Sequence, residues 1–283
     1  MHSIDCVDSA FDITNFSNYK LSIQVALNGL SFCIQDKLAK KFVAFKFYPI
    51  KPDLLKEDFY KKVEEIINND KELNGDFDTA YFMYCTNKCT MVPSLFFDIN
   101  NLKKYFEFNQ QMDDLDELHY DMINEIDGFN VYTVPNQMAI DVTRKYPKTK
   151  FFHHATPFIK NHLKKNASPI GYKVFIQLNY DFFDVIITKA RNLVLFNTFK
   201  YKNAEDLIFF ISYIFNQFDL SFEDVDIMLQ GNTLNPSVYE RKLKEYFKNV
   251  KVTELMSASL FSSVIESGHI QNFYNLFNQI LCV

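Results

Sequence analysis

The strongest constraint on the fold is a repeated pattern in which the opening strand of each repeat contains a glutamine. The first repeat opens with Leu21-Ser22-Ile23-Gln24-Val25 and the second with Val174-Phe175-Ile176-Gln177-Leu178. After each opening strand come a turn, two more strands, an amphipathic helix and a further strand, in that order. A duplicated unit of this kind predicts two similar lobes that face each other across a cleft.

Length and composition are compatible with two ordered lobes. At 283 residues the chain can bury two modest cores, and its hydrophobic content of 48% indicates a globular protein. The net charge of −5 gives no reason to expect binding to nucleic acid or to an anionic membrane surface. Only 6 glycines are present, which leaves few residues for loops that cradle phosphate.

The cysteines and the hydropathy pattern indicate a cytoplasmic protein. The five cysteines are odd in number and lack the spacing of a disulfide framework, which favours reduced thiols. No stretch approaches the roughly 20 consecutive apolar residues that span a bilayer, so we expect no direct membrane insertion. Residues 1–12 carry three aspartates and do not resemble a secretory signal.

The first repeat is expected to contain strands over residues 19–27, 30–35, 41–48 and 78–85. Asn28-Gly29 is a strong signal for a tight turn between the first two of these strands. A helix is expected before the last strand, because one helical face would collect Leu55, Phe59, Val63, Ile66 and Ile67.

The second repeat is expected to contain strands over residues 173–178, 183–188, 193–201, 225–230 and 250–255. Asn203 is a predicted N-cap for a largely apolar helix over 204–218. Asn235-Pro236 predicts an N-cap followed by proline at the first position of the next helix. A terminal helix is expected over 272–281.

A third region separates the repeats. Its expected elements are a helix over 98–108, an acidic loop over 113–117, a hairpin of 119–126 and 130–134, a helix that is capped by Asn136 and runs to Tyr146, a strand over 150–154 and a helix opened by Pro157. Ser168, Pro169 and Gly171 mark the predicted boundary between the lobes. The predicted domains are therefore a first lobe over 1–170, with an inserted subdomain at about 98–146, and a second lobe over 171–283.

This order of elements resembles the α/β, duplicated actin-like (ribonuclease H-like) two-lobe fold, with an inserted subdomain in the first lobe. The branch that it resembles most is that of the bacterial proteins FtsA and PilM. The chain also resembles a bacterial family, domain of unknown function 3822, itself thought to be actin-like. The resemblance covers about residues 19–255. It implies that an aspartate on the first strand of each lobe would handle the metal and phosphates of a nucleotide.

The motifs of the actin-like fold can be placed on this sequence. A first strand that usually reads Ile-Asp-Ile-Gly-Ser-Ser is matched here by residues 23–28, and its second-lobe counterpart by residues 176–181. The adenosine motif, a strand that ends in glycines, is matched by Leu229-Gln230-Gly231-Asn232. The resemblance implies that a nucleotide would meet Gln24, Asn28, Gln177, Asn179, Asp181, Gly231 and Asn232.

The departures from these motifs weaken the case for nucleotide chemistry. Gln24 and Gln177 are neutral and cannot help to organise Mg²⁺ as an aspartate would. Leu27 and Tyr180 place side chains where glycines would let backbone N–H groups approach phosphate. Because phosphoryl transfer depends mostly on positioning and electrostatics, we expect no catalytic residues, no metal and no cofactor.

Two functions from different classes therefore stand open. The first is a non-catalytic binding or scaffolding module with a degraded nucleotide cleft, a pseudo-ATPase. The alternative is an ATP-binding protein or weak ATPase with Mg²⁺, in which Asp181 and Asp184 would bind the metal from shifted positions. A thiol- or metal-dependent enzyme is a more distant third.

Two further groups have two interpretations each, and a third has one. Cys85 and Cys89 are either half of a zinc site or two unpaired thiols. His154 either lies beside the cleft or is a capping or surface histidine. The acidic residues at 113–117 are expected to form a solvated loop.

A protein partner is expected, with residues 98–146 as its contact surface and with no role for nucleic acid. This stretch combines acidic residues with the aromatic side chains of Tyr105, Phe108 and Tyr120. The alternative is that the insertion only covers an edge of the first lobe's sheet.

Overall fold

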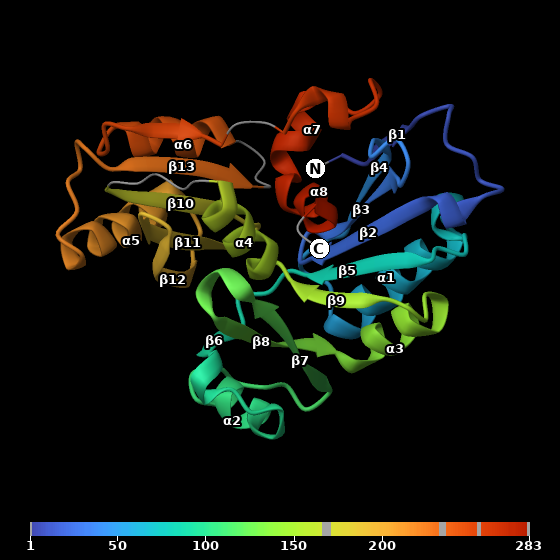
Figure 1. The fold of residues 1–283 in the computed structure, drawn as a ribbon, viewed down its shortest axis with the longest axis horizontal. Coiled ribbons are helices and arrows are strands. Elements are labelled where there is room, and N and C mark those ends of the chain that lie inside the picture. Colours follow the sequence, from blue (N-terminus) through green and yellow to red (C-terminus); the bar gives the residue numbers. More distant parts are fainter. Residues whose placement is uncertain (1, 166–170, 232–235, 254–255, 282–283) are drawn as a thin grey trace.

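The computed structural model describes residues 2–165, 171–231, 236–253 and 256–281. Two large sheets form two lobes, and a smaller sheet lies below them in the view of Figure 1. Helices α4 (Ala155–Lys165) and α8 (Tyr274–Leu281) lie between the two large sheets and contact each other. The backbone therefore has the two-lobe arrangement that the repeated pattern predicts.

The first large sheet has six strands in the order β1-β4-β3-β2-β5-β9. Its strands are β1 (Ile4–Val7), β2 (Tyr19–Ala26), β3 (Gly29–Asp36), β4 (Phe42–Pro49), β5 (Thr79–Tyr84) and β9 (Lys150–His153). The three strands β2, β3 and β4 form an antiparallel meander, whereas β5 and β9 run parallel to β2. Parallel pairing of this kind needs crossover connections, which the helices supply.

The second large sheet repeats this topology with five strands in the order β12-β11-β10-β13-β14. Its strands are β10 (Tyr172–Leu178), β11 (Phe182–Lys189), β12 (Asn192–Lys200), β13 (Asp226–Gly231) and β14 (Val250–Val252). Here β10, β11 and β12 form the antiparallel meander, and β13 runs parallel to β10.

The register shows that the repeat extends to individual positions. Gln24 pairs with Ser31 across its hairpin and with Met83 on the parallel strand. Gln177 pairs with Asp184 and with Gln230 in the corresponding places. The two glutamines are therefore equivalent, and Asp184 stands in the second lobe where Ser31 stands in the first.

The inserted subdomain contains an antiparallel sheet in the order β6-β8-β7. Its strands are β6 (Cys89–Pro93), β7 (Asp116–Ile123) and β8 (Gly128–Pro135), and α2 (Leu102–Glu107) packs against all three. The sheet begins before the predicted insertion, at Cys89. After β8 the chain enters α3 (Asn136–Lys145), which packs against α1 (Lys56–Asn69) of the first lobe.

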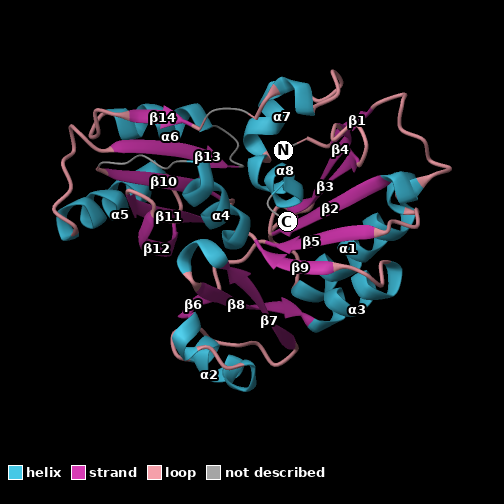
Figure 2. Cartoon of the chain, in the orientation of Figure 1, coloured by secondary structure: helices cyan, strands magenta, loops and turns pink. Residues whose placement is uncertain are grey.

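Helices cover both faces of the large sheets (Figure 2). In the first lobe, α1 and α3 share a core with alternate residues of β2, and α8 packs on the other face of β2 and β3. In the second lobe, α5 (Ala204–Gln217) and α6 (Pro236–Lys244) cover one face. The remaining helix, α7 (Ser267–Asn272), precedes α8. The last two helices thus continue the chain of the second repeat but pack on the sheet of the first.

Several local predictions are confirmed and others are wrong. The side chain of Asn203 accepts a hydrogen bond from the N–H of Asp206, as a helix N-cap should. Asn136 makes no such cap and is itself the first residue of α3. The helix expected over 98–108 forms only from Leu102, after a 3₁₀ turn. Asn235 and residues 254–255 lie outside the described residues.

Candidate nucleotide cleft and the polar network between the lobes

Two hairpin turns frame the place where the actin-like fold would hold a nucleotide. The turn of Leu27 and Asn28 joins β2 to β3, and the turn over 179–181 joins β10 to β11. A pocket of about 170 Å³ lies between them, with Leu27, Tyr84 and Phe182 among its lining residues. Ligand pockets usually measure about 300–1,000 Å³, so this space is small for a nucleoside triphosphate.

Gln24 and Gln177 lie on the inner faces of the two sheets. Because side chains alternate along a strand, Gln24 shares its face with Ser22. The hydroxyl of Ser22 donates a hydrogen bond to Oε1 of Gln279 in α8, 2.5 Å away. Both glutamines are buried, and neither is among the residues that line the 170 Å³ pocket.

Gln177 belongs to a hydrogen-bonded chain that ties β10 to α4. Nε2 of Gln230 donates to Oε1 of Gln177 over 2.6 Å. The Oε1 atom of Gln230 lies 3.0 Å from Nε2 of His162, which is the donor if that nitrogen carries the proton. The His162 ring also stacks on Phe175, with 4.2 Å between the ring centroids. The amide of Gln177 is thus used to hold a helix against the sheet.

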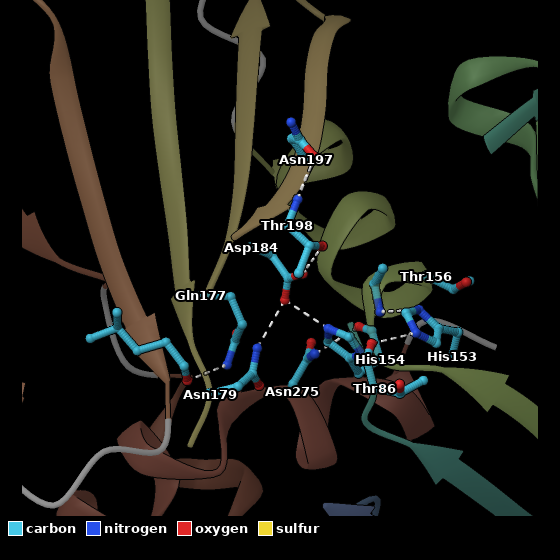
Figure 3. A network of polar contacts seen from close by, with 12 residues as sticks. Thr86, His153, His154, Thr156, Gln177, Asn179, Asp184, Asn197, Thr198 and Asn275 are labelled. Atoms are coloured by element: carbon cyan, nitrogen blue, oxygen red, sulfur yellow. Dashed lines mark hydrogen bonds and ion pairs between the residues drawn. The ribbon is translucent and has the colours of Figure 1, made fainter. Parts of the chain in front are cut away.

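The most buried acid of the region, Asp184, receives hydrogen bonds from three side chains (Figure 3). Its Oδ2 atom lies 2.7 Å from Nε2 of His154 and 2.9 Å from Nδ2 of Asn179. Its Oδ1 atom accepts a bond of 2.7 Å from the hydroxyl of Thr198. Asp184 is 0% exposed, and protein groups occupy three of the roughly four acceptor sites of its carboxylate.

His154 connects this acid to the chain segment between β9 and α4. It follows β9 directly, and its ring reaches across to β11 of the second lobe. Its carbonyl accepts a hydrogen bond of 2.8 Å from Nδ2 of Asn275 in α8. His154 is therefore a buried residue between the lobes and not a surface histidine. Its Nδ1 atom has no hydrogen-bond partner among the described residues.

The other residues that were predicted to contact a nucleotide lie in different surroundings. Asp181 lines the 170 Å³ pocket, and its burial raises the pKa of its carboxyl group. Asn28 is buried, and its carbonyl accepts a hydrogen bond from the N–H of Ile50. Gly231 ends β13 beside Leu178, while Asn232 lies outside the described residues. Among the described residues, the structure brings Asn179 onto Asp184, and Asp181 alone of the predicted set lines the 170 Å³ pocket.

The two cysteines of the zinc interpretation are buried thiols. Burial raises the pKa of both Cys85 and Cys89, which keeps their thiols protonated and poor as ligands or nucleophiles. No cluster of three or more histidine, cysteine, aspartate or glutamate side chains suited to a metal ion occurs in the part of the chain that the structure describes.

A second buried acid, Asp121, ties the inserted subdomain to the first lobe. Its carboxylate accepts hydrogen bonds from the hydroxyls of Tyr132 and Thr156 and from the N–H of His153. Burial raises the pKa of Asp121 to about 7. Strand β7 thus lies against β9, the edge strand of the first sheet, so the insertion does cover this edge.

Sequence reasoning named His154 and Asn179 but missed Thr198, the third partner of Asp184. It also missed Asn275, which bonds to the His154 carbonyl, and His162, which contacts Gln230. These residues belong to elements far apart in the chain. Asp184 was named only as a shifted metal ligand, although a further signal existed: it follows Gln177 by the same interval that separates Ser31 from Gln24. Comparing the two repeats position by position would have singled it out.

Two similar lobes joined by a pair of helices, with an extra antiparallel sheet in the first lobe, define the actin-like class of proteins. A Bacteroides thetaiotaomicron VPI-5482 protein with an actin-like ATPase fold and unknown function matches with a TM-score of 0.82 at 18% identity, over 97% of this chain and 100% of that chain. The PilM-PilN type IV pilus biogenesis complex matches with a TM-score of 0.55 at 11% identity, over 93% and 96%.

The sequence also identifies a family. The model of the family described as "Protein of unknown function (DUF3822)" matches residues 8–250, so the chain belongs to this family. No curated protein matches the chain. The predicted actin-like fold is thus confirmed, while identities below 25% establish no activity. None of the helices in the described ranges is long and apolar enough to cross a membrane.

Proposed function

We propose that this protein is a non-catalytic, actin-like binding module whose interlobe cleft does not take Mg-ATP. The observation that supports this most is the state of Asp184, a carboxylate of β11 three residues beyond the second hairpin turn. It is fully buried and already accepts hydrogen bonds from His154, Asn179 and Thr198. A metal ion would have to displace these donors, and the neutral Gln24 and Gln177 offer no replacement charge.

A cytoplasmic location is part of this proposal. The four cysteines among the described residues, Cys6, Cys33, Cys85 and Cys89, are all free thiols. Free thiols in a protein of this size are typical of a reducing compartment.

Isothermal titration with Mg-ATP tests the cleft directly. We expect no saturable heat and no Mg²⁺-dependent hydrolysis. The lysine that lines the interlobe pocket, Lys56, is already paired with Asp113, and burial disfavours the charged form of the pocket's one carboxyl group, Asp181. A dissociation constant in the micromolar range, about −8 kcal/mol, would support the alternative of an ATP-binding protein or weak ATPase. Loss of that heat in Gln24→Ala or Gln177→Ala would locate the nucleotide in the cleft.

We further propose that the module binds a partner protein through its inserted subdomain. Several large apolar side chains in this subdomain are more than half exposed: Leu95, Phe96, Ile99, Phe108, Leu115 and Met122. Exposed apolar groups concentrated in one region are typical of protein contact sites. PilM, which has a similar fold, is known from a complex with PilN, and this precedent agrees with a binding role.

Pull-down with surface variants tests the contact surface. The variant Phe96→Ser/Phe108→Ser is expected to lose most partner recovery while folding normally, since both side chains are largely exposed. Its matched control is Phe209→Ser/Tyr213→Ser, which removes two exposed aromatic groups from α5 of the second lobe. Unchanged recovery with the insertion variant, or an equal loss with the control, would reject the insertion as the contact surface.

A further inference from the structure

A groove much larger than the interlobe pocket lies between the first lobe and the inserted subdomain. Its volume is about 780 Å³, compared with about 170 Å³ for the pocket between the hairpin turns. One wall is the exposed face of α1, and the opposite side is formed by residues 111–116 and by the start of α3. Tyr60 and Lys56 line both spaces, so the groove adjoins the interlobe pocket.

The lining of this groove has an excess of negative charge. Six of its side chains are carboxylates and two are lysines. Lys56 forms an ion pair with Asp113, and Lys61 lies 3.8 Å from Asp58, on α1 beside the groove. Among the described residues no basic nitrogen lies within ion-pair distance of Glu57, Glu64 or Asp114.

The charged form of one acid of the groove, Asp116, is disfavoured. Asp116 opens β7 and accepts a hydrogen bond of 3.0 Å from the hydroxyl of Thr133. Burial raises the pKa of its carboxyl group, and the neighbouring charge of Asp113 adds to the effect. A positive group placed between Asp113 and Asp116 would offset both effects on the Asp116 carboxyl group, because an opposite charge favours the ionised carboxylate.

The groove is not only acidic. Tyr60, Met112, Leu115 and Pro135 contribute apolar surface between the carboxylates. Leu115 is 80% exposed, which leaves its side chain without a cover in the folded protein. A ligand that satisfies this lining carries positive charges and apolar groups in alternation.

We propose that this groove binds a basic, amphipathic peptide segment of a partner protein. The proposal rests on the proposed binding role and names the chemistry of the partner. The negative charge of the groove favours lysine or arginine side chains on the peptide. The apolar surface between the carboxylates favours leucine-like side chains between those basic residues. A peptide fits better than a small ligand because the groove is open and runs between two separate elements.

Fluorescence anisotropy with a short, labelled peptide of alternating leucine and lysine tests the groove. We expect saturable binding to the full chain that weakens with added salt, because exposed charge pairs are screened. The double variant Glu57→Gln/Asp114→Asn is expected to weaken binding about fivefold to tenfold, as the loss of two partly exposed charge contacts should. Leu115→Lys, which places a competing cation at an exposed position, should have a similar effect.

The control variant Glu205→Gln/Glu223→Gln removes two exposed carboxylates from the second lobe and should leave the affinity unchanged. Three results would overturn the proposal: no saturable binding, equal binding of a leucine–glutamate peptide, or an equal loss of affinity in the control variant. Displacement of the peptide by an equal concentration of spermidine would instead assign the groove to a small polyamine. If the peptide did not bind while partner recovery still depended on Phe96 and Phe108, only the proposal about the groove would be rejected.

Discussion

Replacing Asp184 with alanine should lower the free energy of unfolding by about 3–5 kcal/mol, the usual cost of removing one partner from a buried, charge-assisted network. The carboxylate is 0% exposed and accepts hydrogen bonds from His154, Asn179 and Thr198. Without it, the buried His154 and the half-buried Asn179 and Thr198 lose their acceptor at once. Urea denaturation, followed by far-ultraviolet circular dichroism and by tyrosine fluorescence, would measure the change.

The control for this prediction is Asp181→Ala. Asp181 lies on the same hairpin turn, but burial disfavours its charged form, and we expect a change below about 1 kcal/mol. A double-mutant cycle with His154→Ala should give a coupling energy above about 1 kcal/mol, since the two side chains are in direct contact. Equal effects of Asp184→Ala and Asp181→Ala would show that Asp184 does not hold the lobes together.

The same network explains why an actin-like chain can keep its shape without the carboxylates of a metal site. In the second lobe Asp184 is directed at His154, which belongs to the chain segment of the first lobe between β9 and α4. The contact crosses from one lobe to the other without a nucleotide. We therefore interpret the acid near the second turn as a structural link between the lobes rather than as a shifted metal ligand.

The fold could be predicted from the sequence because its signals are local. The alternation around Gln24 and Gln177, the Asn28-Gly29 turn and the N-cap Asn203 each specify a strand, a hairpin or a helix start within a few residues. Their repetition in the same order then limited the topology to two equivalent lobes. The predicted order of the meander, helix and parallel strand is the order that both sheets show.

Other features depend on contacts between distant segments and could not be predicted. Strand β1 is short, and it forms by pairing with β4 rather than from its own pattern. The packing of α8 on β2 and β3 follows from tertiary contacts that its apolar periodicity does not specify. Two partners of Asp184 directly follow β9 and β10, and the third lies in β12, so no single stretch of sequence carries a signal for the network.

Replacing Gly231 with alanine should also destabilise the protein, by about 3–5 kcal/mol. Gly231 has φ = +124°, a backbone conformation that costs residues with a side chain about 1–3 kcal/mol. An added Cβ atom would lie 2.1 Å from the carbonyl oxygen and 2.6 Å from the nitrogen of Leu178, so the backbone of β10 or β13 would have to move. Overpacking of this kind typically costs a further 1–3 kcal/mol.

Gly268→Ala provides the matched control. Gly268 lies in α7, and a Cβ atom there would meet nothing within 4 Å, so alanine should stabilise the protein by about 0.4–1 kcal/mol. Gly231 is the one glycine that this chain keeps from the adenosine motif, and its close approach is to Leu178 on the neighbouring strand β10. If Gly231→Ala proved neutral for unfolding but altered the binding of a nucleotide, the glycine would serve a ligand. A large loss of stability without bound nucleotide would show that strand packing alone requires a glycine at this position.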